Sequence, residues 1–251
     1  MPPLVTTEQR GDVAVVRIER PPANALDLEL LAAGRQAAEE LRAADPRAVV
    51  IVGRERFFSA GVDLKAVPQL DAAGQRAMVE GISRLFVEWY SFPRPVVCAV
   101  NGHAIAGGMI IALCGDYRVC TNGDAKLGLT EVRAGVPYPQ VAMAIVRAEL
   151  APPAARVVAL GAELVGPEAA LQLGLVDELR EPEEVLDRAV EVATGYAALP
   201  GAGYAYAKEQ MRGATVRELR RIVEEGSDPL LTQGWVDEES VGAASAILER
   251  R

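Results

Sequence analysis

Three short segments of the 251-residue sequence carry residue types suited to acid–base chemistry on a carbonyl compound. The first spans residues 57–65, FFSAGVDLK, and follows an apolar run. Its small Ser-Ala-Gly turn, before an acid and the next expected helix, can leave a backbone amide without an internal partner at the edge of a cavity. Taken alone, the segment is more typical of an ordinary turn from a strand to a helix.

The second segment runs from Asn101 to Gly108 and ends in two glycines that open an apolar stretch. Glycine allows a backbone amide, here that of Gly107, to approach a ligand closely. The helix that follows would direct the positive end of its dipole at the same point. Two such amides from two loops would form an oxyanion hole for an enolate or a tetrahedral oxygen.

The third segment, GLTEVRAGVP at residues 128–137, places Glu131 between apolar neighbours. By charge alone a solvated glutamate, or one paired with Arg133, is the default interpretation. If the side chain is desolvated instead, its pKa rises toward a value that suits a general base.

Several other kinds of site are excluded by the motifs that the sequence lacks. It has no Gly-x-Gly-x-x-Gly after a strand, no Walker lysine, no His-Glu-x-x-His and no Gly-x-Ser-x-Gly. The single histidine, His103, lies in an expected turn and is expected to be structural rather than a base. Cys98, Cys114 and Cys120 match no metal-ligand spacing, so no metal site is expected.

The elements that would position these segments follow from hydrophobic patterning. We predict a hairpin from strands at 5–7 and 13–18, and buried strands at 48–52, 96–100 and 116–120. Helices are expected after Asp27, across 78–89 and from Gly107. The remainder is predicted to be mostly helical, at 140–150, 153–160, 167–173, 182–199, 204–212, 215–225 and 229–250, with one strand at 175–179. The fold class is therefore α/β with a helical C-terminal extension.

Composition limits the class of protein and its partners. Half of the residues are apolar and 24% are charged, which is typical of a soluble globular protein. The net charge is −9 and there is no basic stripe, so nucleic acid is not expected as a partner. We predict no signal peptide and no membrane span, and the odd number of cysteines favours a reducing cytoplasmic location.

Together the segments resemble the crotonase, or enoyl-CoA hydratase/isomerase, superfamily. The resemblance is carried by NAL at 24–26, FFSAGVDLK at 57–65, VVCAVNGHAIAGG at 96–108, CGDYR at 114–118, GPEAA at 166–170 and LGLVD at 173–177. It implies a spiral core of ββα units, expected at 1–194, and a helical region at 195–251 that serves in oligomerisation. It also implies an acyl-CoA thioester as ligand, no separate cofactor, and a homotrimer or a dimer of trimers.

The resemblance also implies roles for residues in the matching motifs. The amides of Val62 and Gly107 would form the oxyanion hole, and Glu131 would be the catalytic acid–base group. The positions that would bind substrate are Asn24, Ala25, Leu26, Ala60, Gly61, Asp63, Leu64, Lys65, Gly108 and Ile110.

One departure from the family pattern bears on the reaction. Hydratases of the superfamily use two glutamates, and the first of these positions is Ile110 here, which cannot exchange a proton. The chain is closest in motif to Δ3,Δ2-enoyl-CoA isomerases, in which one base moves one proton between two carbons. Alternatives are another crotonase-type reaction (hydration, thioester hydrolysis or C–C cleavage), a non-catalytic acyl-CoA binding protein, and a purely structural oligomer that binds no CoA ester.

Overall fold

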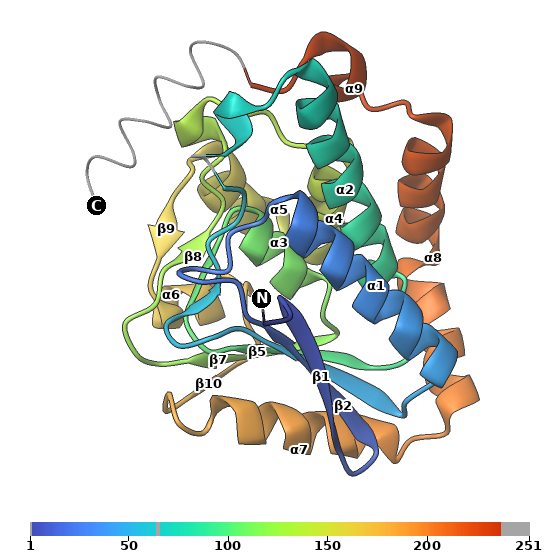
Figure 1. The fold of residues 1–251 in the computed structure, drawn as a ribbon. Helices are drawn as coiled ribbons and strands as arrows, with labels where there is room; N and C mark the ends of the chain where they lie inside the picture. The colour runs from blue at the N-terminus through green and yellow to red at the C-terminus, as the bar shows by residue number, and fades with distance from the viewer. Residues whose placement is uncertain (1, 64–65, 237–251) are drawn as a thin grey trace.

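The chain forms two β-sheets, the larger covered by helices on both faces, in a computed structural model that describes residues 2–63 and 66–236 (Figure 1). The larger sheet has the order β1-β2-β3-β5-β7-β10. Its β1 and β2 form an antiparallel hairpin, and all later neighbours are parallel. The strands are β1 (Val5–Arg10), β2 (Val13–Ile18), β3 (Ala48–Val52), β5 (Val96–Val100), β7 (Tyr117–Thr121) and β10 (Glu178–Arg180).

Helices lie on opposite sides of this sheet (Figure 1). On one side are α1 (Leu28–Ala44), α2 (Ala72–Tyr90) and α3 (Gly107–Leu113), and on the other is α7 (Val185–Ala197). Alternate residues of β3 therefore enter two separate cores: Val49 and Ile51 pack on the α1–α3 side, whereas Val50 packs on the α7 side. This double burial explains the unbroken apolar run at 48–52.

The remaining helices follow Glu131 in the chain. They are α4 (Gln140–Glu149), α5 (Pro152–Ala155), α6 (Pro167–Gln172), α8 (Gly201–Glu225) and α9 (Leu230–Gln233). A π-helical turn, η3 (Arg156–Leu160), continues α5, and short 3₁₀ turns occur at η1 (Val67–Gln69) and η2 (Val132–Ala134).

A second, smaller sheet has the order β4-β6-β8-β9 and was not predicted from the sequence. It consists of β4 (Phe57–Ser59), β6 (His103–Ile105), β8 (Leu127–Gly128) and β9 (Leu164–Val165). The first three strands are parallel, with Ser59 paired to Ala104 and Ile105 to Gly128. Strands of two or three residues are too short to show the alternating pattern from which strands are recognised.

Most predicted elements of the first two thirds are confirmed, including the cap of α1 by Asp27, whose side chain accepts from the Leu30 amide at 2.8 Å. Four predictions are wrong in detail. His103 begins a strand rather than lying in a turn, and the strand expected at 175–179 is β10, at Glu178–Arg180. The helices expected at 204–212 and 215–225 are one helix, α8. The helix expected at 229–250 ends at Gln233, as far as the described residues extend.

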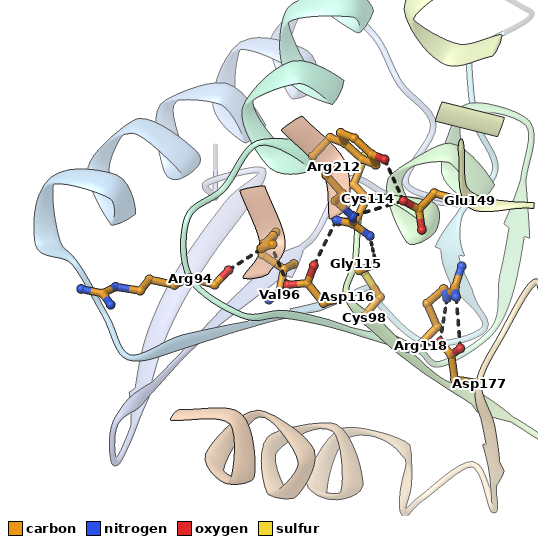
Figure 2. Close-up of polar contacts among 12 residues, drawn as sticks. Arg94, Val96, Cys98, Cys114, Gly115, Asp116, Arg118, Glu149, Asp177 and Arg212 are labelled. Carbon is orange, nitrogen blue, oxygen red and sulfur yellow. Dashed lines mark hydrogen bonds and ion pairs between the residues drawn. The ribbon is translucent and has the colours of Figure 1, made fainter. Parts of the chain in front are cut away.

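A buried cluster of ionic side chains fixes α8 to the core (Figure 2). Asp116, directly before β7, lies 2.7 Å from Lys208 and 3.0 Å from Arg212. Arg212 also pairs with Glu149 at 3.1 Å and donates to the carbonyls of Cys114 and Gly115 at 2.9 Å. Because charged groups out of water need partners, this network specifies where α8 can dock.

Two further points concern the architecture as a whole. Across residues 2–63 and 66–236, no helix is both long enough and apolar enough to span a bilayer. The expected division into 1–194 and 195–251 stays a prediction, and residue 194 lies within α7.

Candidate active site

The three segments singled out in the sequence follow the carboxyl ends of three neighbouring parallel strands. Val62 comes after β4, Gly107 after β6 and Glu131 after β8. The Ala106 amide donates to the Gly128 carbonyl at 2.8 Å, which continues the β6–β8 pairing beyond the strands. Val62 and Glu131, which are 69 residues apart in the sequence, therefore both follow strands at one edge of the small sheet, where ligands commonly bind in such folds.

The amide of Val62 points away from the chain that flanks it. Leu26 forms a parallel bridge with Val62, in which the Leu26 amide donates to Gly61 O at 2.7 Å and the Asp63 amide donates to Leu26 O at 3.0 Å. Because successive peptide groups of an extended segment point in opposite directions, the N–H of Val62 is directed away from Leu26. Within the described part of the chain this amide donates no hydrogen bond.

The amide of Gly107 is the first of α3 and so has no partner within the helix. Ala106 before it has a φ of 54°, a conformation that a residue with a β-carbon rarely adopts. A β-carbon placed on Gly61 would lie 2.9 Å from the Gly107 nitrogen and 2.6 Å from Ile105 O. The two loops are thus in direct contact, and only glycine at position 61 allows it.

The segment Asn24–Leu26 is hydrogen-bonded to the loop that follows β4 and carries Val62. The Asn24 side chain is wholly buried and makes three hydrogen bonds to backbone groups, at the Arg20 amide and at the carbonyls of Phe57 and Phe58. Ser59 Oγ donates to Asn24 O at 2.7 Å and accepts from the Gly61 amide at 3.2 Å. The polar groups of the Asn24 side chain therefore bind backbone groups and hold this loop in its conformation.

Arg20 ties this loop to the start of α1. Its guanidinium lies 2.7 Å from Asp27, the cap of α1, and 3.1 Å from Asp63, the residue after Val62. All three side chains are about one-fifth exposed, so these pairs are screened less than surface pairs are. Arg20 thereby restrains the backbone on the carboxyl side of the Val62 amide.

Glu131 is the acidic group of the third segment. It precedes the η2 turn, and its Oε2 atom is buried and accepts no hydrogen bond from any described residue. Burial raises the pKa of this carboxyl from 4.5 to about 7, and the rise is opposed by the backbone of Glu131, by the Tyr138 hydroxyl and by the backbone of Thr130. A carboxyl that titrates near neutrality is suited to general acid–base catalysis.

The other expected site residues fall into three groups. Ala60 and Gly61 lie in the turn after β4, and Ala25 lies beside Leu26. Gly108 and Ile110 are wholly buried in α3, and a β-carbon on Gly108 would lie 2.2 Å from Ser59 O, so α3 packs directly on β4. Leu64 and Lys65 lie outside the described residues.

The histidine and the cysteines have structural environments. His103 Nδ1 accepts from the Lys126 amide at 2.9 Å, and its ring packs on Phe57 with centroids 4.9 Å apart. The three cysteines are buried, and burial raises the pKa of Cys98 and of Cys120 to about 12, so neither supplies a thiolate at neutral pH. No cluster of metal-ligating side chains occurs among the described residues.

Sequence reasoning missed three residues that shape this site: Arg20, Ala106 and Tyr138. Arg20 and Tyr138 contact partners 43 and 21 positions away, Asp63 and the carbonyl of Ala159, which no local motif reveals. Ala106 gave one signal, its place immediately before the Gly-Gly pair, but a left-handed alanine is not recognisable from residue type.

Comparisons with known proteins all match one family. Residues 8–240 match the family model described as enoyl-CoA hydratase/isomerase. A putative enoyl-CoA hydratase of Thermus thermophilus is 39% identical over 191 residues, covering 74% of each chain. Mouse mitochondrial enoyl-CoA delta isomerase 1 is 33% identical over 224 residues, covering 86% of this chain and 76% of the relative.

The fold has close counterparts among solved structures. The structure of human mitochondrial Δ3-Δ2-enoyl-CoA isomerase superposes with a TM-score of 0.87 at 28% identity, covering 98% of this chain and 97% of that one. The match extends over the small sheet and the helical C-terminal part as well as the larger sheet.

Proposed function

The chain belongs to the enoyl-CoA hydratase/isomerase family, and we propose that it moves the double bond of a 3-enoyl-CoA to the 2-position by one-base proton transfer. Family membership implies an enzyme that acts on an acyl-CoA thioester. The observation that carries the finer proposal is the pairing of one neutral-range carboxyl, Glu131, with a wholly buried isoleucine, Ile110, at the position where hydratases carry their other glutamate.

The proposed reaction uses a single carboxylate twice. Glu131 removes a proton from C2 of the 3-enoyl thioester, and the electron pair of that C–H bond delocalises over the diene to the thioester oxygen. The amides of Val62 and Gly107 donate to this dienolate oxygen, and each such donor typically lowers the barrier by on the order of 3 kcal/mol. Glu131 then returns the proton at C4, which leaves a double bond between C2 and C3.

The pKa of Glu131 fits both halves of this cycle. The base must be ionised to take the C2 proton and must then act as an acid at C4. A pKa of about 7 makes both forms accessible near neutral pH. The overall change moves one proton and one double bond without oxidation or reduction, so the scheme contains no redox cofactor and no metal.

Ile110 supports isomerisation over hydration. Addition of water across the 2,3-double bond needs a group that activates water and a group that delivers a proton. Ile110 supplies neither, and its side chain, 0% exposed, belongs to the apolar core. The names of the relatives include both reactions, so a hydratase is the alternative that the experiment must test.

The assay compares two substrates. Purified protein is mixed separately with 3-hexenoyl-CoA and crotonyl-CoA, and the absorbance of the 2-enoyl thioester is followed. We expect 2-enoyl-CoA to form from the first substrate and the second to remain unchanged. Glu131→Gln should abolish the reaction, whereas Glu168→Gln, at an exposed glutamate in the first turn of α6, should leave it intact.

Two other outcomes contradict the proposal. Consumption of crotonyl-CoA would show hydration and therefore a second acid. Binding of acyl-CoA that is unaffected by Glu131→Gln, with no turnover of either substrate, would indicate a binding protein.

We also propose a homotrimer or a dimer of trimers in the cytoplasm. Buried, unpaired cysteines with raised pKa values fit a reducing compartment. Light scattering coupled to size-exclusion chromatography measures the oligomeric mass directly.

A further inference from the structure

The segment at residues 228–236 is hydrogen-bonded to the loop that leads from Glu131 to α4. Asp228 Oδ2 accepts from the amide of Gln140, the first residue of α4, at 2.7 Å. Trp235 Nε1 donates to Pro137 O, within the loop, at 3.0 Å. These contacts join positions that are 88 and 98 residues apart, so a distant part of the chain holds the loop that follows the candidate base.

The groups that contact the loop are themselves fixed. Trp235 is 4% exposed and belongs to the main core. The amides of Trp235 and Val236 donate to Gln75 Oε1, in α2, at 3.4 and 3.1 Å, and α9 lies beside the start of α2 (Figure 1). Asp228 is buried, and its other carboxylate oxygen accepts from the Leu230 amide at 3.0 Å. The segment is therefore a rigid support rather than a loose end.

A short path of backbone bonds leads from Pro137 to Glu131. The amide of Val136, a buried residue, donates to Glu131 O at 2.9 Å, and the Ala134 amide donates to the same oxygen at 3.0 Å. Pro137 directly follows Val136, and its ring fixes its own φ. A restraint on Pro137 O is thus transmitted to the Val136 amide through few free torsions, and from there to the backbone of Glu131.

From these contacts we infer that Trp235 is a positioning residue for Glu131, and this inference rests on the proposed function. The indole holds Pro137 O, and the loop in turn holds the backbone from which the Glu131 side chain extends. Asp228 secures the loop where it enters α4. Trp235 acts through the loop, and no substrate bond forms or breaks at it.

The proposed reaction makes the placement of this backbone important. One carboxylate must reach C2 to take the proton and C4 to return it. Oε2 of Glu131 accepts no hydrogen bond from the residues that the structure describes, so the direction of the carboxyl depends strongly on its backbone. A displacement of about 1 Å in a reacting group can cost on the order of a hundredfold in rate.

Two variants remove the hydrogen bond from the indole. Trp235→Phe keeps an aromatic ring in the core and lacks the N–H group. Incorporation of 3-benzothienylalanine at position 235 keeps the size of the side chain as well, because a sulfur atom replaces the N–H. The matched control is Trp89→Phe, which also removes a buried indole, one that is stacked on Phe92 in α2 and the turn after it.

The primary measurement does not require turnover. Hydrogen–deuterium exchange, resolved to single residues, reports the protection of the Val136 amide. We expect this amide to exchange at least about tenfold faster in both position-235 variants, since Pro137 O loses its donor, while amides of β3 keep their rates. Trp89→Phe should leave the rate at Val136 unchanged.

Kinetics with 3-hexenoyl-CoA test the consequence for the base. Both position-235 variants should lower kcat about tenfold and change KM by less than about twofold, because a misplaced base impairs the proton transfer rather than the binding of the thioester. Trp89→Phe should retain the kcat of the unmodified protein.

The outcomes separate the two proposals. An unchanged exchange rate at Val136, or an unchanged kcat in both position-235 variants, would overturn the positioning role even if Glu131→Gln abolishes isomerisation. Exchange that accelerates equally in β3 would indicate general destabilisation and would also overturn it. An unmodified protein that does not isomerise 3-hexenoyl-CoA would overturn the proposed function, and exchange at Val136 would still decide whether Trp235 holds the loop. If Trp235→Phe does not fold, the benzothienylalanine variant decides alone.

Discussion

Glu131→Gln should stabilise the protein while it abolishes activity, because the glutamate is held where water cannot solvate its charge. The substitution keeps the size of the side chain and removes its titration. Burial raises the pKa of Glu131 from 4.5 to about 7 in the folded protein. At about 1.4 kcal/mol for each pKa unit, the folded state is penalised by about 3 kcal/mol when the carboxyl is ionised.

The sign of the pH dependence follows from this difference. Between pH 4.5 and about 7 the folded protein retains a proton that the unfolded chain has released, so its stability falls as pH rises through this window and changes no further above it. Glutamine carries no such proton. The free energy of unfolding of Glu131→Gln should therefore gain about 3 kcal/mol on that of the unmodified protein between about pH 4.5 and about pH 8.

Urea unfolding, followed by circular dichroism at equal protein concentration across this pH range, measures the effect. Glu168→Gln is the control, since Glu168 is exposed and its substitution should leave the pH profile unchanged. If the profiles of Glu131→Gln and the unmodified protein are parallel, Glu131 titrates normally in the folded protein, and its assignment as a buried base is refuted.

Three further predictions concern the loops and the ionic cluster. Gly61→Ala places a β-carbon 2.6 Å from Ile105 O at a φ of 77°, so kcat should fall by at least tenfold and the protein should lose stability. At the control position, Gly166→Ala, a β-carbon meets no atom within 4 Å, so neither kcat nor stability should change. Kinetics with 3-hexenoyl-CoA measure kcat, and thermal unfolding measures stability. Asp116→Asn leaves two buried cations without their shared acid and should lower the free energy of unfolding by about 3 kcal/mol in urea, against less than about 1 kcal/mol for Arg10→Ala at an exposed pair. Arg20→Met removes the restraint on Asp63 and should lower kcat more than it raises KM, and an unchanged kcat would contradict the restraint on the Val62 amide.

The larger sheet and the first helices were predictable because each element carries its own periodic signal. The run at 48–52 is apolar on both faces, and Asp27 stands directly before the helical pattern that it caps. The length of α8 was mispredicted because Gly213, which suggests a break, lies inside a helix that the Arg212 contacts hold in place. Tertiary contacts outweigh local propensity there.

The site was predictable in its parts but not in its assembly. The glycines and Glu131 stand in recognisable motifs, yet their proximity depends on strands of two or three residues that pair across long sequence separations. The raised pKa of Glu131 also depends on burial, which its charge alone predicts against. Tyr138 has no signature in the sequence, since its hydroxyl is held by the carbonyl of Ala159, 21 positions away.

The candidate catalytic groups follow three different strands of the small sheet. The groups that would hold the oxyanion follow β4 and β6, while the group that would move the proton follows β8. Substitutions after β8 can therefore alter the destination of the proton without disturbing the means of stabilising the enolate. Position 110 lies in α3 behind the Gly107 amide, so a change there could add or remove a second acid while the backbone donors stay in place, which fits relatives of one fold that are named for different reactions.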